Sequence, residues 1–265
     1  MNDVKKYLKT GMPVIGTWLN SGSPIVAELM AASGFDFVCV DAEHSAVGLP
    51  QTQQIFQAIR SGNQDCAAMV RLHGVDYSFV KQYLDAGARG IIAPLIRTRA
   101  EAELLVQASK YPPLGLRGVG FCRANDYGMR LAEEFETAND EILIGVQIEH
   151  IEAVNNIEDI LGVNGIDAVF IGPYDLSASM GITGKFEHSD YKLAEEKIIR
   201  ACQKHQIIPG IHIVSPNPNE VVNRYHEGYR LLAYSLDITM LTTACQNGLS
   251  EIKKNIPIQS TVINE

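Results

Sequence analysis

The sequence predicts a single (β/α)8 TIM barrel, an α/β fold that spans residues 1–265 as one domain. Short apolar segments rich in β-branched residues recur along the chain, and helical patterns separate them. Eight such segments can be counted, which is the number of strands that closes this barrel. A length of 265 residues is also usual for one barrel domain.

The predicted strands are apolar along their whole length. This pattern is expected of parallel strands that are buried on both faces of the sheet. The segments are residues 14–19, 35–41, 67–71, 90–93, 142–149, 168–171, 208–213 and 231–235.

Helix start and stop signals lie between these strands. Ser23 before Pro24 is a capping residue followed by proline in the first turn, and Gly34 ends that helix. Thr98 with Glu101 three residues later predicts a capping box. The other helices are predicted over residues 49–60, 76–86, 151–161, 189–205, 219–226 and 237–256.

The alternation of strands and helices is interrupted once, between residues 94 and 142. A helix is followed there by the run YPPLGLRGVG (residues 111–120) and by another helical stretch. A loop so rich in glycine and proline is expected to be functional or to form an interface. Leu114, Leu116 and Phe121 lie in it beside Arg117 and Arg123, and apolar groups rimmed by arginine suit an interface.

Composition excludes several classes of protein. The net charge of −9 and the lack of a basic stripe argue against a nucleic-acid partner. The first ten residues are too polar for a signal peptide, and no apolar run reaches membrane-spanning length. The five cysteines are scattered without a CxxC pair, which indicates a reducing compartment and predicts a cytoplasmic protein without a membrane partner.

Two carboxylates at the ends of consecutive strands are the strongest functional signal. Glu149 closes one apolar run, and Asp175 follows the next one after a Gly-Pro-Tyr turn. Ligands bind at the carboxyl ends of strands in such folds, and paired carboxylates suit a hard cation such as Mg²⁺ or Mn²⁺. The alternative is that both residues are helix N-caps.

Other polar residues are expected at the same end of the barrel. His44 suits a general base, although alone it could be an ordinary loop histidine. Arg71 could serve a substrate carboxylate or enolate, or it could only pair with Asp41 or Glu43. Gln147 would be an uncharged hydrogen-bonding group beside the metal.

Three further observations refine this set of residues. His212 lies in the seventh strand, and its direction cannot be read from the sequence. Trp18 fits a lid or a core wall better than a catalytic group. No lysine ends a predicted strand, so a Schiff-base mechanism lacks its residue and a metal would activate the carbonyl group.

At these residues the chain resembles the HpcH/HpaI aldolase family of class II, metal-dependent pyruvate aldolases, which includes hydroxy-ketoheptanedioate and 2-dehydro-3-deoxyglucarate aldolases. The resemblance covers nearly the whole chain. It is carried by four motifs in order, FVCVDAEH (residues 37–44), YPPLGLRGVG (111–120), VQIE (146–149) and FIGPYDLS (170–177).

The resemblance implies a reaction and roles for matching residues. The reaction would be reversible cleavage of a 4-hydroxy-2-oxo acid to pyruvate and an aldehyde, through a pyruvate enolate held by the metal and Arg71. His44 would be the base and Asp85 the aspartate that tunes it. Mg²⁺, Mn²⁺ or Co²⁺ would be the cofactor and a homohexamer the assembly. The residues that would contact pyruvate or metal are Gln147, Gly172, Pro173, Tyr174, Glu149 and Asp175.

Two positions depart from the pattern of the family, which has a small residue at Tyr174 and an aliphatic one at His212. Both are expected on the acceptor side of the pocket, where they predict a preference for small hydroxylated or carboxylated aldehydes. Two other functions remain open at this point. One is a phosphoenolpyruvate mutase-like, Mg²⁺-dependent isomerase or phosphotransferase, and the other is a non-catalytic metabolite-binding barrel.

Overall fold

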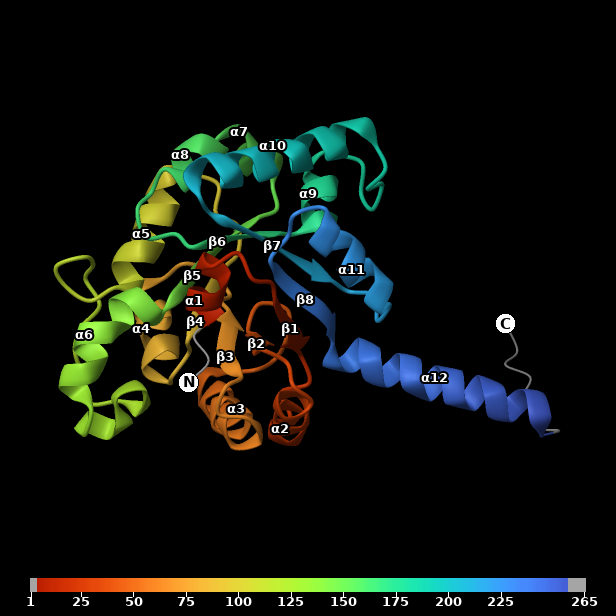
Figure 1. Ribbon diagram of the computed structural model, residues 1–265, viewed down its shortest axis with the longest axis horizontal. Helices are drawn as coiled ribbons and strands as arrows, with labels where there is room; N and C mark the ends of the chain where they lie inside the picture. Colours follow the sequence, from red (N-terminus) through yellow and green to blue (C-terminus); the bar gives the residue numbers. More distant parts are fainter. Residues whose placement is uncertain (1–3, 257–265) are drawn as a thin grey trace.

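A closed barrel of eight parallel strands forms the centre of the molecule (Figure 1). The structure is a computed structural model that describes residues 4–256. Each strand pairs with its neighbours in sequence, and the last strand closes against the first. The strands are β1 (Val14–Leu19), β2 (Phe37–Asp41), β3 (Ala67–Arg71), β4 (Gly90–Ala93), β5 (Leu143–Ile148), β6 (Ala168–Ile171), β7 (Ile208–Ile213) and β8 (Leu231–Leu236).

Helices follow the strands and cover most of the outer face of the barrel (Figure 1). They are α1 (Val4–Lys9), α2 (Pro24–Ala32), α3 (Leu49–Gly62), α4 (Tyr77–Asp85), α5 (Arg99–Ser109), the 3₁₀ segment η1 (Arg123–Gly128), α6 (Leu131–Glu141), α7 (Ile151–Asn155), α8 (Ile157–Leu161), α9 (Pro173–Ser179), α10 (Ser189–His205), α11 (Pro218–His226) and α12 (Asp237–Asn255).

The predicted fold class is confirmed, and the strand bounds agree with the prediction to within two residues. The capping box of Thr98 and Glu101 is also present. The prediction of one helix over residues 151–161 is wrong. Asn156 leaves helical geometry there, and its side chain donates a hydrogen bond to the carbonyl of Arg97, so α7 ends and α8 begins. The short helix α1 is not predicted from the sequence.

Apolar side chains pack in two separate layers. One fills the space between the outer face of the strands and the helices, and it forms the larger cluster. The other fills the inside of the barrel, where Trp18, Phe37, Met69 and Phe170 are buried. Gly16 is required in this inner layer, because a Cβ there would lie 2.3 Å from the ring of Phe37. The interior is therefore a packed core that supports the strand ends above it.

Helix α1 covers the N-terminal end of the barrel and brings a buried charge to it. Val4 and Leu8 pack against the inner core, while Lys5 is only 4% exposed. Nζ of Lys5 lies 2.9 Å from Oδ2 of Asp167 and donates a 3.0 Å hydrogen bond to the carbonyl of Ile142. This ion pair ties α1 to the chain just before β5 and β6.

Helix α12 leaves the barrel instead of packing along it (Figure 1). Only Asp237 at its start is buried, and the side chains of Leu241, Leu249, Ile252 and Ile256 are exposed. None of the described helices is long and apolar enough to cross a membrane.

We predict that Lys5→Met lowers the free energy of unfolding by about 3 kcal/mol, because it removes the ion-pair partner of the largely buried Asp167. Urea denaturation measures the change. Lys9→Met is the matched control, since Lys9 is an exposed lysine of the same helix. Equal stability of the two variants would contradict a structural role for the buried pair.

Candidate active site

A cavity of about 400 Å³ opens at the C-terminal end of the barrel. Its walls come from the ends of strands β1, β2, β3, β5, β6 and β7 and from the first turns of α9 and α11. Most residues predicted for the site meet here, and no lysine is among the described residues that line it. The lining includes Asn20, Asp41, His44, Arg71, Gln147, Gly172, Pro173, Tyr174, Asp175 and His212.

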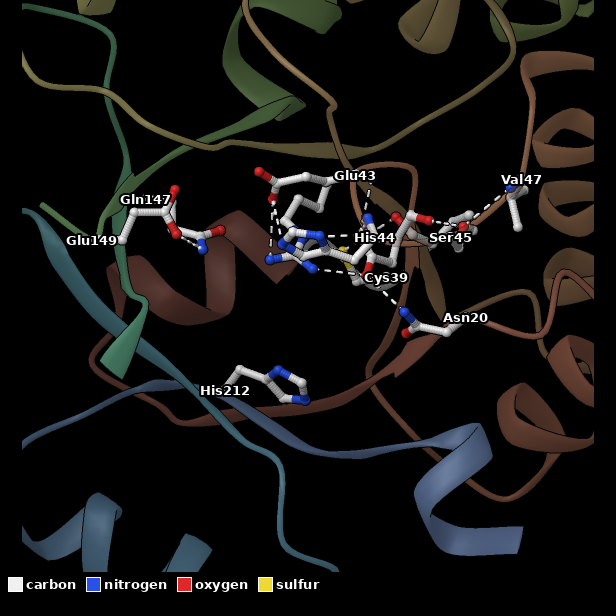
Figure 2. A network of polar contacts seen from close by, with 12 residues as sticks. Asn20, Cys39, Glu43, His44, Ser45, Val47, Gln147, Glu149 and His212 are labelled. Atoms are coloured by element: carbon white, nitrogen blue, oxygen red, sulfur yellow. Dashed lines mark hydrogen bonds and ion pairs between the residues drawn. The ribbon is translucent and has the colours of Figure 1, made fainter. Parts of the chain in front are cut away.

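Glu149 is a buried carboxylate held by two donors directly after β5. The backbone N–H of Leu95, which follows β4, donates a 2.7 Å hydrogen bond to Oε1 of Glu149. Nε2 of Gln147 donates to Oε2, and Figure 2 shows these two side chains turned toward each other. Burial, aided by the charges of Glu43 and Asp175 and opposed by these hydrogen bonds, raises the pKa of Glu149 to about 7. Neither of the two donors that hold Glu149 carries a positive charge.

Asp175 lies in the first turn of α9 and is exposed to the cavity, so it does not itself end a strand. The N-cap of α9 is Gly172, and the N-cap of α7 is His150. Neither Glu149 nor Asp175 is therefore an N-cap, which rejects that alternative. A Cβ at Gly172 would lie 2.8 Å from Oε2 of Glu149, so glycine leaves room beside that oxygen.

Arg71 is fixed by carboxylates from β2 and its following loop. Nε and Nη2 donate to Oδ1 and Oδ2 of Asp41 at 2.9 and 2.7 Å, and Nη1 lies 3.2 Å from Oε2 of Glu43. Burial favours a raised pKa for Asp41, but the hydrogen bonds and charge of Arg71 outweigh it and lower that pKa. Asn20 adds a 2.7 Å hydrogen bond to Oδ2. Arg71 therefore forms the ion pairs with Asp41 and Glu43 that the sequence offered as one alternative, while its role toward a substrate stays a prediction.

His44 reaches the cavity from the loop after β2. Its backbone N–H donates a 3.2 Å hydrogen bond to Oδ1 of Asp41. Asp41, which holds Arg71 in place, therefore also holds this loop. The ring is 62% exposed, and Nε2 lies 3.8 Å from Oε2 of Glu43 (Figure 2). A largely exposed imidazole at the edge of a cavity suits a general base, which is the predicted role of His44.

Trp18 forms an aromatic wall between two other site residues. Its ring stacks on that of His212 with centroids 4.7 Å apart and planes 9° apart. The guanidinium carbon of Arg71 lies 4.3 Å from the ring centroid of Trp18. His212 therefore points into the barrel, which the sequence left open, and its Nε2 lies 3.0 Å from the carbonyl oxygen of Ser235. Burial lowers the pKa of His212 to about 4, and the charge of Arg71 also lowers it.

Tyr174 lies at the mouth of the cavity and is 56% exposed. Its ring meets the edge of Phe186 at 5.1 Å, and Phe186 also lines the cavity. This position agrees with a place on the acceptor side, although its contact with a substrate stays a prediction.

Asp85 is the one predicted catalytic residue that lies outside the cavity. It ends α4, close to the N-terminal ends of the strands, whereas His44 lies at their C-terminal ends. Its Oδ1 accepts a 2.9 Å hydrogen bond from Nη2 of Arg117, which is fully buried. Arg117 is thus not on the rim of the apolar loop as expected. Leu114, Leu116 and Phe121 of that loop are exposed.

The oxygen-rich end of the cavity fits a divalent cation. Oε1 of Gln147 is buried without a hydrogen-bond partner, and it adds a neutral oxygen to the carboxylates of Glu149 and Asp175. Among residues 4–256, no three His, Cys, Asp or Glu side chains are grouped closely enough to hold a metal alone. Mg²⁺ typically uses one or two carboxylates and takes other ligands from substrate and water, so this donor set suits it.

Two contributors to the site escape sequence reasoning. The backbone N–H of Leu95 reaches Glu149 because Leu95 adopts a left-handed conformation with φ of 55°. This conformation is uncommon for leucine and cannot be predicted from the residue type. Asn20 follows the first strand, and this position is the one available signal for its contact with Asp41.

Comparison with known proteins identifies relatives of this arrangement. The family model described as HpcH/HpaI aldolase/citrate lyase matches residues 14–244. The chain is 37% identical over 248 residues to the 4-hydroxy-2-oxo-heptane-1,7-dioate aldolase of Escherichia coli, covering 92% of each chain. It is 38% identical over 248 residues to the protein of the same name from Klebsiella pneumoniae, covering 92% and 91%. The crystal structure of HpcH/HpaI aldolase from Desulfitobacterium hafniense matches with a TM-score of 0.89 at 34% identity, covering 97% of this chain and 98% of that one.

We predict that His212 makes the protein less stable as the pH falls below 6.5. Its pKa is lower in the fold than in the unfolded chain, so its contribution is complete above pH 6.5 and is lost progressively toward pH 4. Between pH 7 and pH 5 the wild type should lose about 2 kcal/mol more unfolding free energy than His212→Gln. The measurement is urea denaturation at each pH. His226→Gln, which changes an exposed histidine, should follow the wild type, and parallel curves for all three proteins would refute the assignment.

Proposed function

The chain belongs to the HpcH/HpaI aldolase/citrate lyase family, and we propose from this premise that it is a lyase that cleaves 4-hydroxy-2-oxo acids reversibly to pyruvate and an aldehyde. One observation supports this most: Asp175, Arg71 and His44 line a single cavity together with Gln147, which donates a hydrogen bond to the buried Glu149 behind it. The relatives named as aldolases favour this reaction over a phosphoenolpyruvate mutase-like one and over a non-catalytic barrel.

A divalent metal, Mg²⁺, Mn²⁺ or Co²⁺, would be held by Glu149 and Asp175. When bound, it would supply a Lewis acid that stabilises negative charge on the oxo acid. Gln147 and the backbone from Gly172 to Tyr174 line the cavity beside these carboxylates and would contact the pyruvate portion. The protein thereby fixes the position of carbons 1 to 3 of the substrate.

The cleavage step begins with His44, which would accept the proton of the C4 hydroxyl group. The C3–C4 bond then breaks, the aldehyde forms at C4, and the electron pair remains on the pyruvate portion as an enolate. Arg71 has five N–H donors, and Asp41 accepts from two of them, so others can face the enolate oxygen. The ion pair with Asp41 thus holds Arg71 in place for its proposed role.

We predict that removal of divalent metal by EDTA abolishes pyruvate release and that Mg²⁺, Mn²⁺ or Co²⁺ restores it. Glu149→Ala and Asp175→Ala should each lose metal binding, because one remaining carboxylate holds such an ion weakly. Isothermal titration calorimetry measures binding, and a coupled pyruvate assay measures turnover. Full activity after exhaustive dialysis against EDTA would show the metal proposal to be wrong.

For His44→Ala we predict a loss of about 10²–10⁴-fold in aldol cleavage, which is the typical effect of losing a general base. Decarboxylation of oxaloacetate forms the same enolate without removal of a hydroxyl proton, so it should fall much less. Steady-state kinetics of both reactions give the comparison. An equal loss in the two reactions would assign His44 a structural role instead.

We also propose a homo-oligomer, which the family resemblance gives as a hexamer. Helices gain most of their stability from packing, yet Leu241, Leu249 and Ile252 of α12 are exposed within the described chain. A second copy would supply that cover. Asp85 lies with the exposed loop of Leu116 and Phe121, at the end of the barrel away from His44. A role beside His44 thus requires a neighbouring copy to present Asp85 to the cavity.

Light scattering at micromolar concentration should give a mass several times 29.1 kDa. His44→Ala and Asp85→Asn should each be nearly inactive alone. Mixed oligomers should regain about a quarter of the activity, because random assembly leaves one site in four with both residues intact. A monomeric mass, or no recovery after proven subunit exchange, would count against this assembly.

A further inference from the structure

A second hollow adjoins the catalytic cavity. A groove of about 650 Å³ runs between α10 and α11, and Phe186, Glu220 and Arg224 line both spaces. The proposed metal and enolate positions lie at the other end, around Glu149 and Arg71. A substituent on C4 that points away from them has this outlet available. The side chains at the junction can therefore discriminate between acceptor aldehydes.

The charge at this junction is negative. Nη1 of Arg224 donates hydrogen bonds to Glu195 at 3.1 Å and to Glu227 at 2.7 Å, so two carboxylates already offset this arginine. The side chain of Glu220 has no hydrogen-bond or ion-pair partner among residues 4–256. Glu220 lies three residues after the N-cap Asn217, in the first turn of α11, where the helix dipole offsets only part of its charge.

The other carboxylates that line the cavity have partners or roles. Asp41 is paired with Arg71, and Asp175 is assigned to the metal. Glu220 is thus the one carboxylate of the described cavity lining without a partner or an assigned role, and its negative charge would face the end of the acceptor aldehyde that is remote from C4. A carboxylate there would be repelled, whereas a hydroxyl group could donate a hydrogen bond to Glu220.

We propose that Glu220 is a specificity residue that selects acceptor aldehydes with neutral, hydroxylated tails over those with a terminal carboxylate. The inference rests on the proposed aldolase function and narrows the expectation of hydroxylated or carboxylated acceptors to the hydroxylated class. The structural alternative is that Glu220 only stabilises the start of α11.

The test is aldol synthesis from pyruvate with a matched pair of acceptors. Succinic semialdehyde carries a terminal carboxylate, and its methyl ester has the same chain without the charge. The measured quantity is the ratio of kcat/KM for the acid to kcat/KM for the ester. Glu220→Gln should raise this ratio about three- to ten-fold, as expected for removing one like charge across a partly solvated gap. The increase should shrink at high salt.

Glu152→Gln is the matched control, because Glu152 is an exposed first-turn glutamate of α7 that does not line the cavity. Its ratio should equal that of the wild type. An unchanged ratio in Glu220→Gln, with a melting temperature lowered as in the control, would assign Glu220 to helix stability and overturn the proposal. Failure of the aldolase function itself would look different, since the wild type would then form no product with any aldehyde.

Discussion

A carboxylate buried at the end of an apolar strand is the constraint on which this site depends. Glu149 follows a strand whose six residues are all buried, and its oxygens are held by the backbone of Leu95 and by Gln147. Neither donor brings a positive charge, and burial with nearby acids raises the pKa of Glu149 to about 7. A divalent cation would compensate the negative charge of the Glu149 carboxylate. Metal binding would therefore also stabilise the local fold.

On the opposite side of the cavity, a buried carboxylate is neutralised by a side chain of the protein itself. Asp41 and Arg71 are neighbours in the register of β2 and β3, and they neutralise each other through two hydrogen bonds. Trp18 covers this pair and stacks on His212, which burial keeps neutral near pH 7. The two sides of the cavity thus differ in one respect: the chain itself supplies Arg71 beside Asp41, whereas the cation proposed beside Glu149 would have to come from solution.

Much of this arrangement follows from the sequence. Asp41, Arg71 and Glu149 each follow or end an apolar run that predicts a strand. A parallel barrel brings such strand-end residues to the same end of the fold, independently of the conformation of the loops. What the sequence does not reveal depends on backbone conformation and packing. Three features of this kind are the hydrogen bond from the N–H of Leu95, the inward direction of His212 and the burial of Arg117. Asp85 shows another limit, because the resemblance assigns it a role beside His44, whereas the structure places it at the end of α4, bonded to Arg117.

We propose that this cavity stabilises the enolate of pyruvate, and hydrogen exchange at the pyruvate methyl group tests that proposal most directly. Proton NMR in D₂O, without any aldehyde, follows the loss of the methyl signal as the enolate forms and is deuterated. We predict exchange that requires the protein and a divalent metal and that is lost in Glu149→Ala. Exchange that is equally fast in Glu149→Ala, or no exchange while the wild type binds pyruvate and metal, would contradict it.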